Sequence, residues 1–495
     1  MDVDRYSAGA EAFATEFARG YYRQFAGLGG AGSFGALYDS HARLFSVEAV
    51  ARLREAAAGE ADPGRRRRLV ALLRFAADGH LGRATAPLEA ELARLEGRAR
   101  VDGLRLGEVA SAQAHEADGA RRAQLEAERC RVIETSLAPL AGQVLAARHA
   151  GARALGWPSY AALYAELGGI ELDGPRGLAA QAQRFLSLTD ARFETVVSGA
   201  VRDTLGLPLD ALTRGDLPRL FRQPALDPHF PASGLDDGLA QTLAGLGIDL
   251  GAQENVVLDL APRTGKSRRA FCAPVRVPQE VYLVLSAAGG WDDYGALLHE
   301  AGHAQHFAAA DPRLPFELRR LSDPAVGEAF AFLLERIADE PIWLRARGVG
   351  DDSGEIVRAR RLLLLRRYAA KLGYELELHS GALALGHAAT VYASRLSGAL
   401  RVPWPRATWL TDVDPGLYVA HYLRAWTLAE QLRAVLVRRF GGAWFQSPAA
   451  GVTLRGWWRA SHGLRAEEVL DLAGAGGFAS AGLDFAGLAA GFGEG

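Results

Sequence analysis

Hydrophobic residues recur at helical spacing over most of the chain, and strand-like stretches occur only in its middle. Residues 1–160 are rich in Ala, Leu, Arg and Glu, which are strong helix formers, and β-branched residues are scarce there. Asp62-Pro63-Gly64 separates two expected helices, and residues 85–97 and 110–150 favour long amphipathic helices. Residues 171–253 continue as helices interrupted by Pro and Gly. The pattern predicts a mainly α-helical protein.

One region of the chain is rich in β-forming residues instead. Its three segments are residues 255–260, 270–277 and 281–286, with turn signals at 262–265 and 278–280. We predict a small antiparallel β-sheet immediately before the next helix. An edge strand of this sheet could pair with an extended substrate, or the sheet could simply pack under that helix.

The helix after the predicted sheet carries the chain's most specific motif, His299-Glu300-Ala301-Gly302-His303. Residues four apart share one helix face, so both imidazoles can bind one metal ion, and Glu300 lies beside them to take a proton from a metal-bound water. Neighbouring Leu297, Leu298 and Phe307 make this a largely buried helix, where such polar residues are costly without a partner. We interpret the motif as a zinc site, on a helix that Asp292 or Asp293 caps.

A catalytic zinc needs a third ligand and an open fourth position. A metzincin would place a third histidine at position 309, which is alanine, so that class is excluded. The remaining candidates are acidic: Glu317, Asp323, Glu328 and Glu335. Asp323 precedes a proline and is expected to cap a helix. Glu328 and Glu335 are seven residues apart on the apolar helix over 325–337, so one could bind zinc while the other orients a ligand.

These residues occur in an order that resembles a known family. The run His299-Glu300-x-Gly302-His303-x-x-His306, followed by Glu328 and Glu335 and preceded by residues 265–272 (Gly-Lys-Ser-Arg-Arg-Ala-Phe-Cys), is similar to the thimet oligopeptidase and oligoendopeptidase F family of zinc peptidases. The resemblance covers about residues 250–460.

The resemblance implies His299, His303 and Glu328 as ligands of one Zn²⁺ per chain, and Glu300 as the general base. It also implies a large helical zinc-peptidase fold with a deep substrate cleft and the small sheet beside the metal helix. Residues 1–250 would form one wall of this cleft and residues 251–495 the zinc-binding half, and the two halves would make one continuous domain.

A later helix, starting near Pro415, carries Tyr418, His421 and Tyr422 within one turn of one another. These are candidates for stabilising the oxyanion, and the resemblance favours Tyr422. Relatives usually have a histidine before that tyrosine, where this chain has Leu410-Thr411-Asp412, and His421 is a candidate to replace it. His306 is expected to support the ligands or to be satisfied in the core.

Composition narrows the function further. The chain has 495 residues, 49% hydrophobic and 23% charged, with a formal net charge of −2, which gives no case for nucleic acid or an anionic membrane as partner. Cys130 and Cys272 are too few for a disulfide framework, and neither a signal peptide nor an apolar run of about 18 residues is evident. We expect a cytoplasmic protein.

The leading hypothesis is a zinc metallopeptidase that hydrolyses oligopeptides with a Glu-activated, zinc-bound water. One alternative is a carboxypeptidase-like exopeptidase, in which Arg424 or Arg268 would grip the substrate's C-terminal carboxylate. Another is a catalytically idle zinc- or peptide-binding protein on the same fold. Glu300 argues against the idle protein, because metal binding alone does not need that residue.

Overall fold

The computed structural model describes every residue except 1, 31, 351–352, 475–481 and 493–495. The chain divides into two compact units, each assembled from three stretches. The first unit comprises Met1–Arg83, Leu226–Gly350 and Arg424–Leu483, and the second comprises Ala84–Ala225, Asp351–Leu423 and Asp484–Gly495. Both of the predicted halves therefore contribute residues to each unit.

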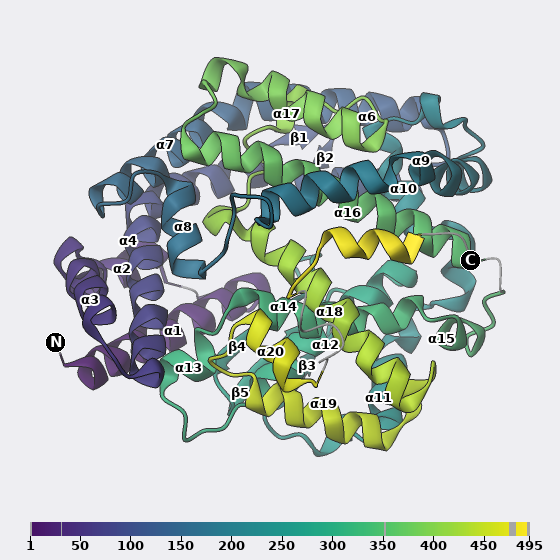
Figure 1. Ribbon diagram of the computed structural model, residues 1–495. Coiled ribbons are helices and arrows are strands. Elements are labelled where there is room, and N and C mark those ends of the chain that lie inside the picture. The colour runs from purple at the N-terminus through teal and green to yellow at the C-terminus, as the bar shows by residue number, and fades with distance from the viewer. Residues whose placement is uncertain (1, 31, 351–352, 475–481, 493–495) are drawn as a thin grey trace. The chain divides into compact units, whose positions relative to one another are not determined.

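The first unit is mainly helical, as predicted (Figure 1). Its helices are α1 (Val3–Phe25), α2 (Phe34–Ser40), α3 (Val47–Gly59), α11 (Leu235–Gly245), α12 (Trp291–Ala308), α13 (Phe316–Arg320), α14 (Pro324–Glu335), α15 (Pro341–Arg345), α19 (Pro448–Ala460) and α20 (Ala466–Leu472). Two further helices, α4 (Pro63–Arg98) and α18 (Tyr418–Phe440), contribute residues to both units.

A three-stranded sheet lies where the sequence predicts it, with β3 (Val256–Asp259), β4 (Phe271–Arg276) and β5 (Glu280–Val284) in the order β3-β5-β4. Strands β4 and β5 form the expected antiparallel hairpin, whereas β3 pairs with β5 in parallel. Strand β5 lies between β3 and β4 and pairs with both of them, so β3 and β4 are not neighbours in the sheet. The sheet is therefore mixed rather than purely antiparallel.

The two faces of this sheet pack against different helices. Phe271, Ala273 and Val284 form a buried cluster with aromatic residues of α1. Because side chains alternate across a strand, Cys272 and its cross-strand neighbour Leu283 lie on the opposite face. Helix α12 contacts all three strands, so the sheet supports the helix that carries the histidine motif.

The second unit is also helical. Its helices are α5 (Val109–His115), α6 (Gly119–Val132), α7 (Ala138–Ala154), α8 (Tyr160–Gly168), α9 (Leu178–Leu205), α10 (Leu217–Arg222), α16 (Ser353–Ser380) and α17 (Leu385–Leu400). The long helix expected over 110–150 is divided, because Asp118 caps α6 by accepting a hydrogen bond from the Ala120 N–H. Among all described residues of both units, no helix combines the length and the apolar character needed to cross a membrane.

A short hairpin in the second unit escaped the sequence analysis. Strands β1 (Arg100–Val101) and β2 (Leu104–Arg105) pair across Asp102 and Gly103, which both have positive φ, at 49° and 80°. Asp-Gly is a strong signal for such a two-residue turn. The signal was present, but the strands are too short to show an alternating pattern.

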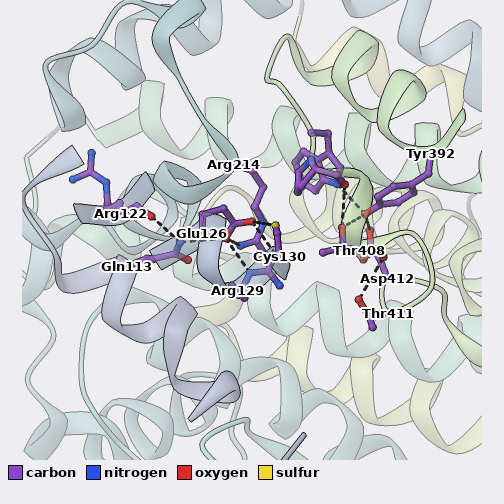
Figure 2. A network of polar contacts seen from close by, with 12 residues as sticks. Gln113, Arg122, Glu126, Arg129, Cys130, Arg214, Tyr392, Thr408, Thr411 and Asp412 are labelled. Atoms are coloured by element: carbon purple, nitrogen blue, oxygen red, sulfur yellow. Dashed lines mark hydrogen bonds and ion pairs between the residues drawn. The ribbon is translucent and has the colours of Figure 1, made fainter. Parts of the chain in front are cut away.

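Buried charges hold the helices of the second unit together. Arg366 donates to the carbonyl oxygens of Leu186 on α9 and Ala399, both at 2.7 Å, and to Asp190. Figure 2 shows a second network, in which Glu126 accepts hydrogen bonds from Arg129 and Arg214. The pKa of Glu126 falls to about 2, because these arginines outweigh the opposing effect of burial.

A further buried carboxyl lies on α16. The Glu375 side chain is fully buried, and its Oε1 accepts a hydrogen bond from the Asp414 backbone N–H at 3.2 Å. Lys371 Nζ lies 3.6 Å from this oxygen but is closer to Asp414 Oδ2, at 2.6 Å. Burial raises the pKa of Glu375 from 4.5 to about 8, and Lys371 only partly opposes this shift.

We predict that Glu375→Gln changes how stability depends on pH. The folded chain holds the Glu375 proton up to about pH 8, whereas the unfolded chain releases it near pH 4.5. The wild type therefore loses stability as pH rises through this window, and the variant lacks that loss. Urea midpoints of both proteins are measured at pH 5 and pH 8. The midpoint of the variant, relative to that of the wild type, should be higher at pH 8 than at pH 5. Equal changes in both proteins would contradict the assignment.

Candidate metal centre

Helix α12 starts differently from the prediction. It begins after Gly290, whose φ of 96° favours glycine, and Gly290 provides no capping side chain. The predicted cap at Asp292 or Asp293 is wrong, because both residues lie inside the first turn. Asp293 Oδ2 instead accepts hydrogen bonds from the backbone N–H groups of Ala288 and Gly289, at 2.7 Å each. It therefore fixes the loop that leads into the helix.

The contact between α12 and α14 is unusually close at one point. A Cβ atom on Gly302 would lie 2.5 Å from both the Ala331 Cα and the Phe330 carbonyl oxygen. Only glycine fits at this position without moving backbone. On the facing helix, a Cβ atom on Gly327 would lie 3.8 Å from His303 Nδ1. Glycine in the middle of the motif thus lets the two helices approach each other beside the histidines.

This approach brings together the three residues that the resemblance implies as ligands. Glu328 Oε2 lies 3.5 Å from His299 Nε2 and 3.6 Å from His303 Nε2. Neighbouring ligand atoms of a tetrahedral zinc, each about 2.0–2.1 Å from the metal, are about 3.3 Å apart. The Glu328 side chain is only 8% exposed. Its carboxylate therefore needs a compensating cation, and the group is a possible metal site.

The second acidic residue of α14 contacts the same histidine on its other side. Glu335 Oε2 lies 2.8 Å from His299 Nδ1. With the proton on Nδ1 donated to Glu335, the Nε2 lone pair points toward Glu328. A carboxylate in this position fixes the tautomer and the ring orientation of a metal-binding imidazole. The spacing of Glu328 and Glu335 left their roles open, and this geometry distinguishes them.

The charges of the cluster reinforce one another. Burial alone would lower the pKa of His299, but hydrogen bonds with Glu328 and Glu335 outweigh it and raise the pKa well above its ordinary value. The two histidines lower the pKa of Glu328 against the opposing effect of burial. Without a metal, the group holds a proton as its cation. A metal ion bound by this group would take the place of that proton.

The other two acidic candidates are engaged elsewhere. Glu317 is fully buried and accepts hydrogen bonds from Ser7 Oγ and Arg68 Nε, both at 2.5 Å. Asp323 is the N-cap of α14, as predicted, and also pairs with Arg424 at 2.8 Å. Both carboxylates therefore serve the fold.

The two arginines proposed as carboxylate anchors have different environments. Arg424 is 4% exposed, and its guanidinium pairs with Asp323 and with Glu467, at 2.8 and 2.9 Å. Its donors are occupied within the protein. Arg268 lies exposed in the loop before β4. The pairing of Arg424 removes it as an anchor.

Glu300 lies next to the ligands on α12 and is partly buried. It is not one of the three residues whose donor atoms converge. Glu300 also acts electrostatically on Cys272 of strand β4. Burial raises the pKa of the Cys272 thiol, and the charge of Glu300 raises it further. Glu300 is therefore a carboxylate beside the metal group rather than a ligand in it.

The predicted aromatic group forms at the start of α18. The Tyr418 ring lies 4.9 Å from that of Tyr422 and 5.7 Å from that of His421, and Tyr368 adds a ring 5.4 Å from Tyr422. These four residues belong to the second unit, whereas the histidine motif belongs to the first.

The Leu410-Thr411-Asp412 stretch, where the family that the sequence resembles carries a histidine, has a structural role in the second unit. Asp412 accepts a hydrogen bond from the Tyr392 hydroxyl at 2.6 Å and pairs with Arg367. Arg367 and Lys371 lower the pKa of Asp412 against the effect of burial. Asp412 thus anchors the loop that leads to α18.

His306, the other histidine of the motif region, is a core residue. His306 Nε2 lies 3.2 Å from Ser461 Oγ, and its ring stacks on that of His462 at 4.3 Å. Burial lowers the pKa of His306 well below its ordinary value, so it is neutral.

Sequence reasoning missed the aromatic surroundings of the metal group. Phe332 lies edge-on to the His299 ring at 5.0 Å and stacks on Trp426 at 4.8 Å. Phe332 follows Glu328 by four residues on an apolar helix, which was an available signal. No local sequence signal predicted the contacts of His306 with Ser461 and His462, because these residues are far apart in the chain.

Comparisons with known proteins add no family assignment. The scan against protein-family models gave no match, and the search of the curated proteins gave no significant one. The metal group therefore rests on its own geometry.

We predict that Gly302→Ala weakens metal binding. The added methyl group would meet the α14 backbone at 2.5 Å, so the helices must separate and Glu328 must withdraw from the histidines. Overpacking of this kind typically costs about 1–3 kcal/mol. The checks are a zinc titration against a chelating dye and a thermal melt.

Gly295→Ala on the same helix is the matched control. Its methyl group would lie 4.0 Å from Glu335 Cγ, which is ordinary contact. Zinc affinity should be kept, with stability equal or slightly higher. Wild-type zinc affinity in Gly302→Ala would show that the close helix contact does not set the site.

A second prediction separates the third ligand from the helix cap. Glu328→Ala should weaken zinc binding by more than about 100-fold, since residues that only orient ligands are typically worth 10- to 100-fold. Asp323→Ala should keep zinc but destabilise the protein by about 2–4 kcal/mol, because it removes a cap and a partner of buried Arg424. Metal analysis and urea unfolding distinguish the two effects. The reverse pattern would make Asp323 the ligand.

Proposed function

We propose that this protein is a zinc-dependent metallopeptidase that hydrolyses peptide bonds of oligopeptides, with one Zn²⁺ per chain. One observation carries the proposal: His299 and His303 Nε2 converge on Glu328 Oε2 while Glu335 holds the other nitrogen of His299. Two imidazoles and one carboxylate are a donor set typical of catalytic zinc, and three protein ligands leave a position open.

The neighbouring carboxylate supports hydrolysis rather than storage of a metal. A zinc ion held by His299, His303 and Glu328 would supply Lewis acidity, which would polarise a carbonyl group and lower the pKa of a water molecule to about 7. Glu300 then accepts the proton of the attacking water and delivers it to the leaving amine nitrogen. A protein that only bound zinc would not need a carboxylate beside its ligands.

Amide hydrolysis also needs a hydrogen-bond donor for the charge that develops on the carbonyl oxygen. We assign this role to Tyr422, with Tyr418 and His421 as the other candidates. Their support is the resemblance and their grouping within one turn of α18. The Tyr422 assignment is a proposal about residues of the second unit.

The cysteines bear on where the enzyme acts. Cys130 and Cys272 are both free thiols, which accords with a reducing compartment. We therefore propose that the peptidase is cytoplasmic.

We predict that Glu300→Gln keeps zinc and loses hydrolysis. The amide is nearly isosteric but accepts no proton, so turnover should fall by roughly 10²- to 10⁴-fold. Zinc content is measured on the purified variant, and hydrolysis is followed with a mixed library of fluorescence-quenched peptides. Wild-type enzyme stripped by a chelator and then reloaded with zinc is the control for metal dependence.

Two outcomes would contradict the proposal in different ways. Undiminished hydrolysis by zinc-loaded Glu300→Gln would remove Glu300 as the general base. A wild type that binds zinc and cleaves no peptide in the library would support the catalytically idle alternative.

A further inference from the structure

Arg320 is a cation without a counter-ion near the metal helix. It ends α13, between α12 and α14, and is partly buried. Within the described ranges, its guanidinium makes neither a hydrogen bond nor an ion pair, and its close contact is the face of the Phe307 ring, 5.3 Å from Cζ to the centroid. An aromatic face attracts a cation but satisfies none of the five N–H donors of arginine.

Neighbouring buried or partly buried arginines of the first unit donate hydrogen bonds to carboxylates or to backbone carbonyl groups. Arg319, the preceding residue, donates to Glu11 and to the Val277 carbonyl oxygen. Arg68 pairs with Glu317, and Arg424 pairs with two carboxylates. Arg320 thus differs from arginines in similar surroundings.

The ionisable neighbour of Arg320, Cys272, supplies no compensating charge. Cys272 of β4 is electrostatically coupled to Arg320 and to Glu300. Burial and Glu300 raise the pKa of this thiol well above its ordinary value, so Cys272 is neutral.

The position of Phe307 relates Arg320 to the metal group. Phe307 follows Glu300 by seven residues and His303 by four, so all three lie on one stripe of α12. Seven residues of helix span about 10 Å. Phe307, whose ring the Arg320 guanidinium contacts, therefore lies about 10 Å along this stripe from the proposed general base. An extended peptide covers this distance in about three residues.

We propose that Arg320 binds a carboxylate of the peptide substrate, about three residues from the bond that is cleaved. A carboxylate fits the planar guanidinium with two parallel hydrogen bonds. This inference rests on the proposed peptidase function and adds a specificity residue to it. The carboxylate is either the free C-terminus of the peptide or an acidic side chain.

The binding arm of the test needs no catalysis. A dye-labelled tripeptide with a free C-terminus, its C-terminal amide, and an amide with aspartate at the last position are titrated by fluorescence polarisation against the metal-free protein. We expect the wild type to bind one or both carboxylate forms about 10- to 100-fold more tightly than the plain amide, as charged hydrogen bonds typically provide. Arg320→Gln should bind all three equally, and Arg320→Lys should keep part of the preference.

The kinetic arm uses the zinc-loaded protein and longer quenched peptides with the same three endings. The wild type should show the preference mainly in KM, and product masses should locate the cleaved bond about three residues from the carboxylate. Arg320→Gln should lose this preference, so that the three peptides differ little in KM. Arg313→Gln, which removes an 82% exposed arginine of the same chain segment, is the matched control and should keep the preference.

Stability distinguishes a ligand-binding arginine from a structural one. Removing a partly buried charge that has no partner should leave the melting temperature of Arg320→Gln equal or higher. A preference for the free C-terminus identifies an exopeptidase-like mode, and a preference that follows the aspartate identifies side-chain recognition. Equal binding of all three ligands by the metal-free wild type would overturn the inference. A carboxylate preference without any hydrolysis would uphold it while contradicting the peptidase function.

Discussion

The close contact between α12 and α14 is the constraint on which the metal group depends. Its histidines lie on one helix and its carboxylates on the other, so the separation of the two helices decides whether the donor atoms converge. Gly302 sets that separation, because any side chain there would meet the backbone of Ala331. The motif therefore does more than supply ligands. Its fourth residue fixes the distance over which Glu328 must reach the imidazoles.

The same contact explains how such polar groups are tolerated in a buried place. A buried carboxylate is costly unless a positive charge compensates it. Glu328 faces two imidazoles, and Glu335 accepts the remaining proton of His299. Each charge is thus matched inside the cluster, whether a proton or a metal ion provides the positive one. The Glu335 contact also prevents the His299 ring from turning its lone pair away.

Short-range patterns predicted much of this arrangement, and contacts between distant segments decided the rest. Helical spacing paired His299 with His303, and β-forming residues located the sheet before α12. The sequence could not distinguish Glu328 from Glu335, because both lie on one helix face and their roles depend on which nitrogen of His299 each one meets. The parallel pairing of β3 likewise depends on where the hairpin of β4 and β5 returns, which no local pattern records. The expected cap is replaced by loop contacts of Asp293, which satisfy backbone groups outside the helix.

The two compact units divide the proposed chemistry in a way that makes it separable. The ligands, Glu335 and Glu300 all belong to the first unit, whereas Tyr422 belongs to the second. Metal binding at the candidate site would therefore depend on the first unit, which contains both α12 and α14. In the second unit, Lys371 and Arg367 hold Asp414 and Asp412, in the loop that leads to Tyr418 and Tyr422. Loss of the contacts that hold Asp412 and Asp414 should then lower the proposed turnover while zinc stays bound. Loss of the close contact between α12 and α14 should lower both zinc affinity and turnover.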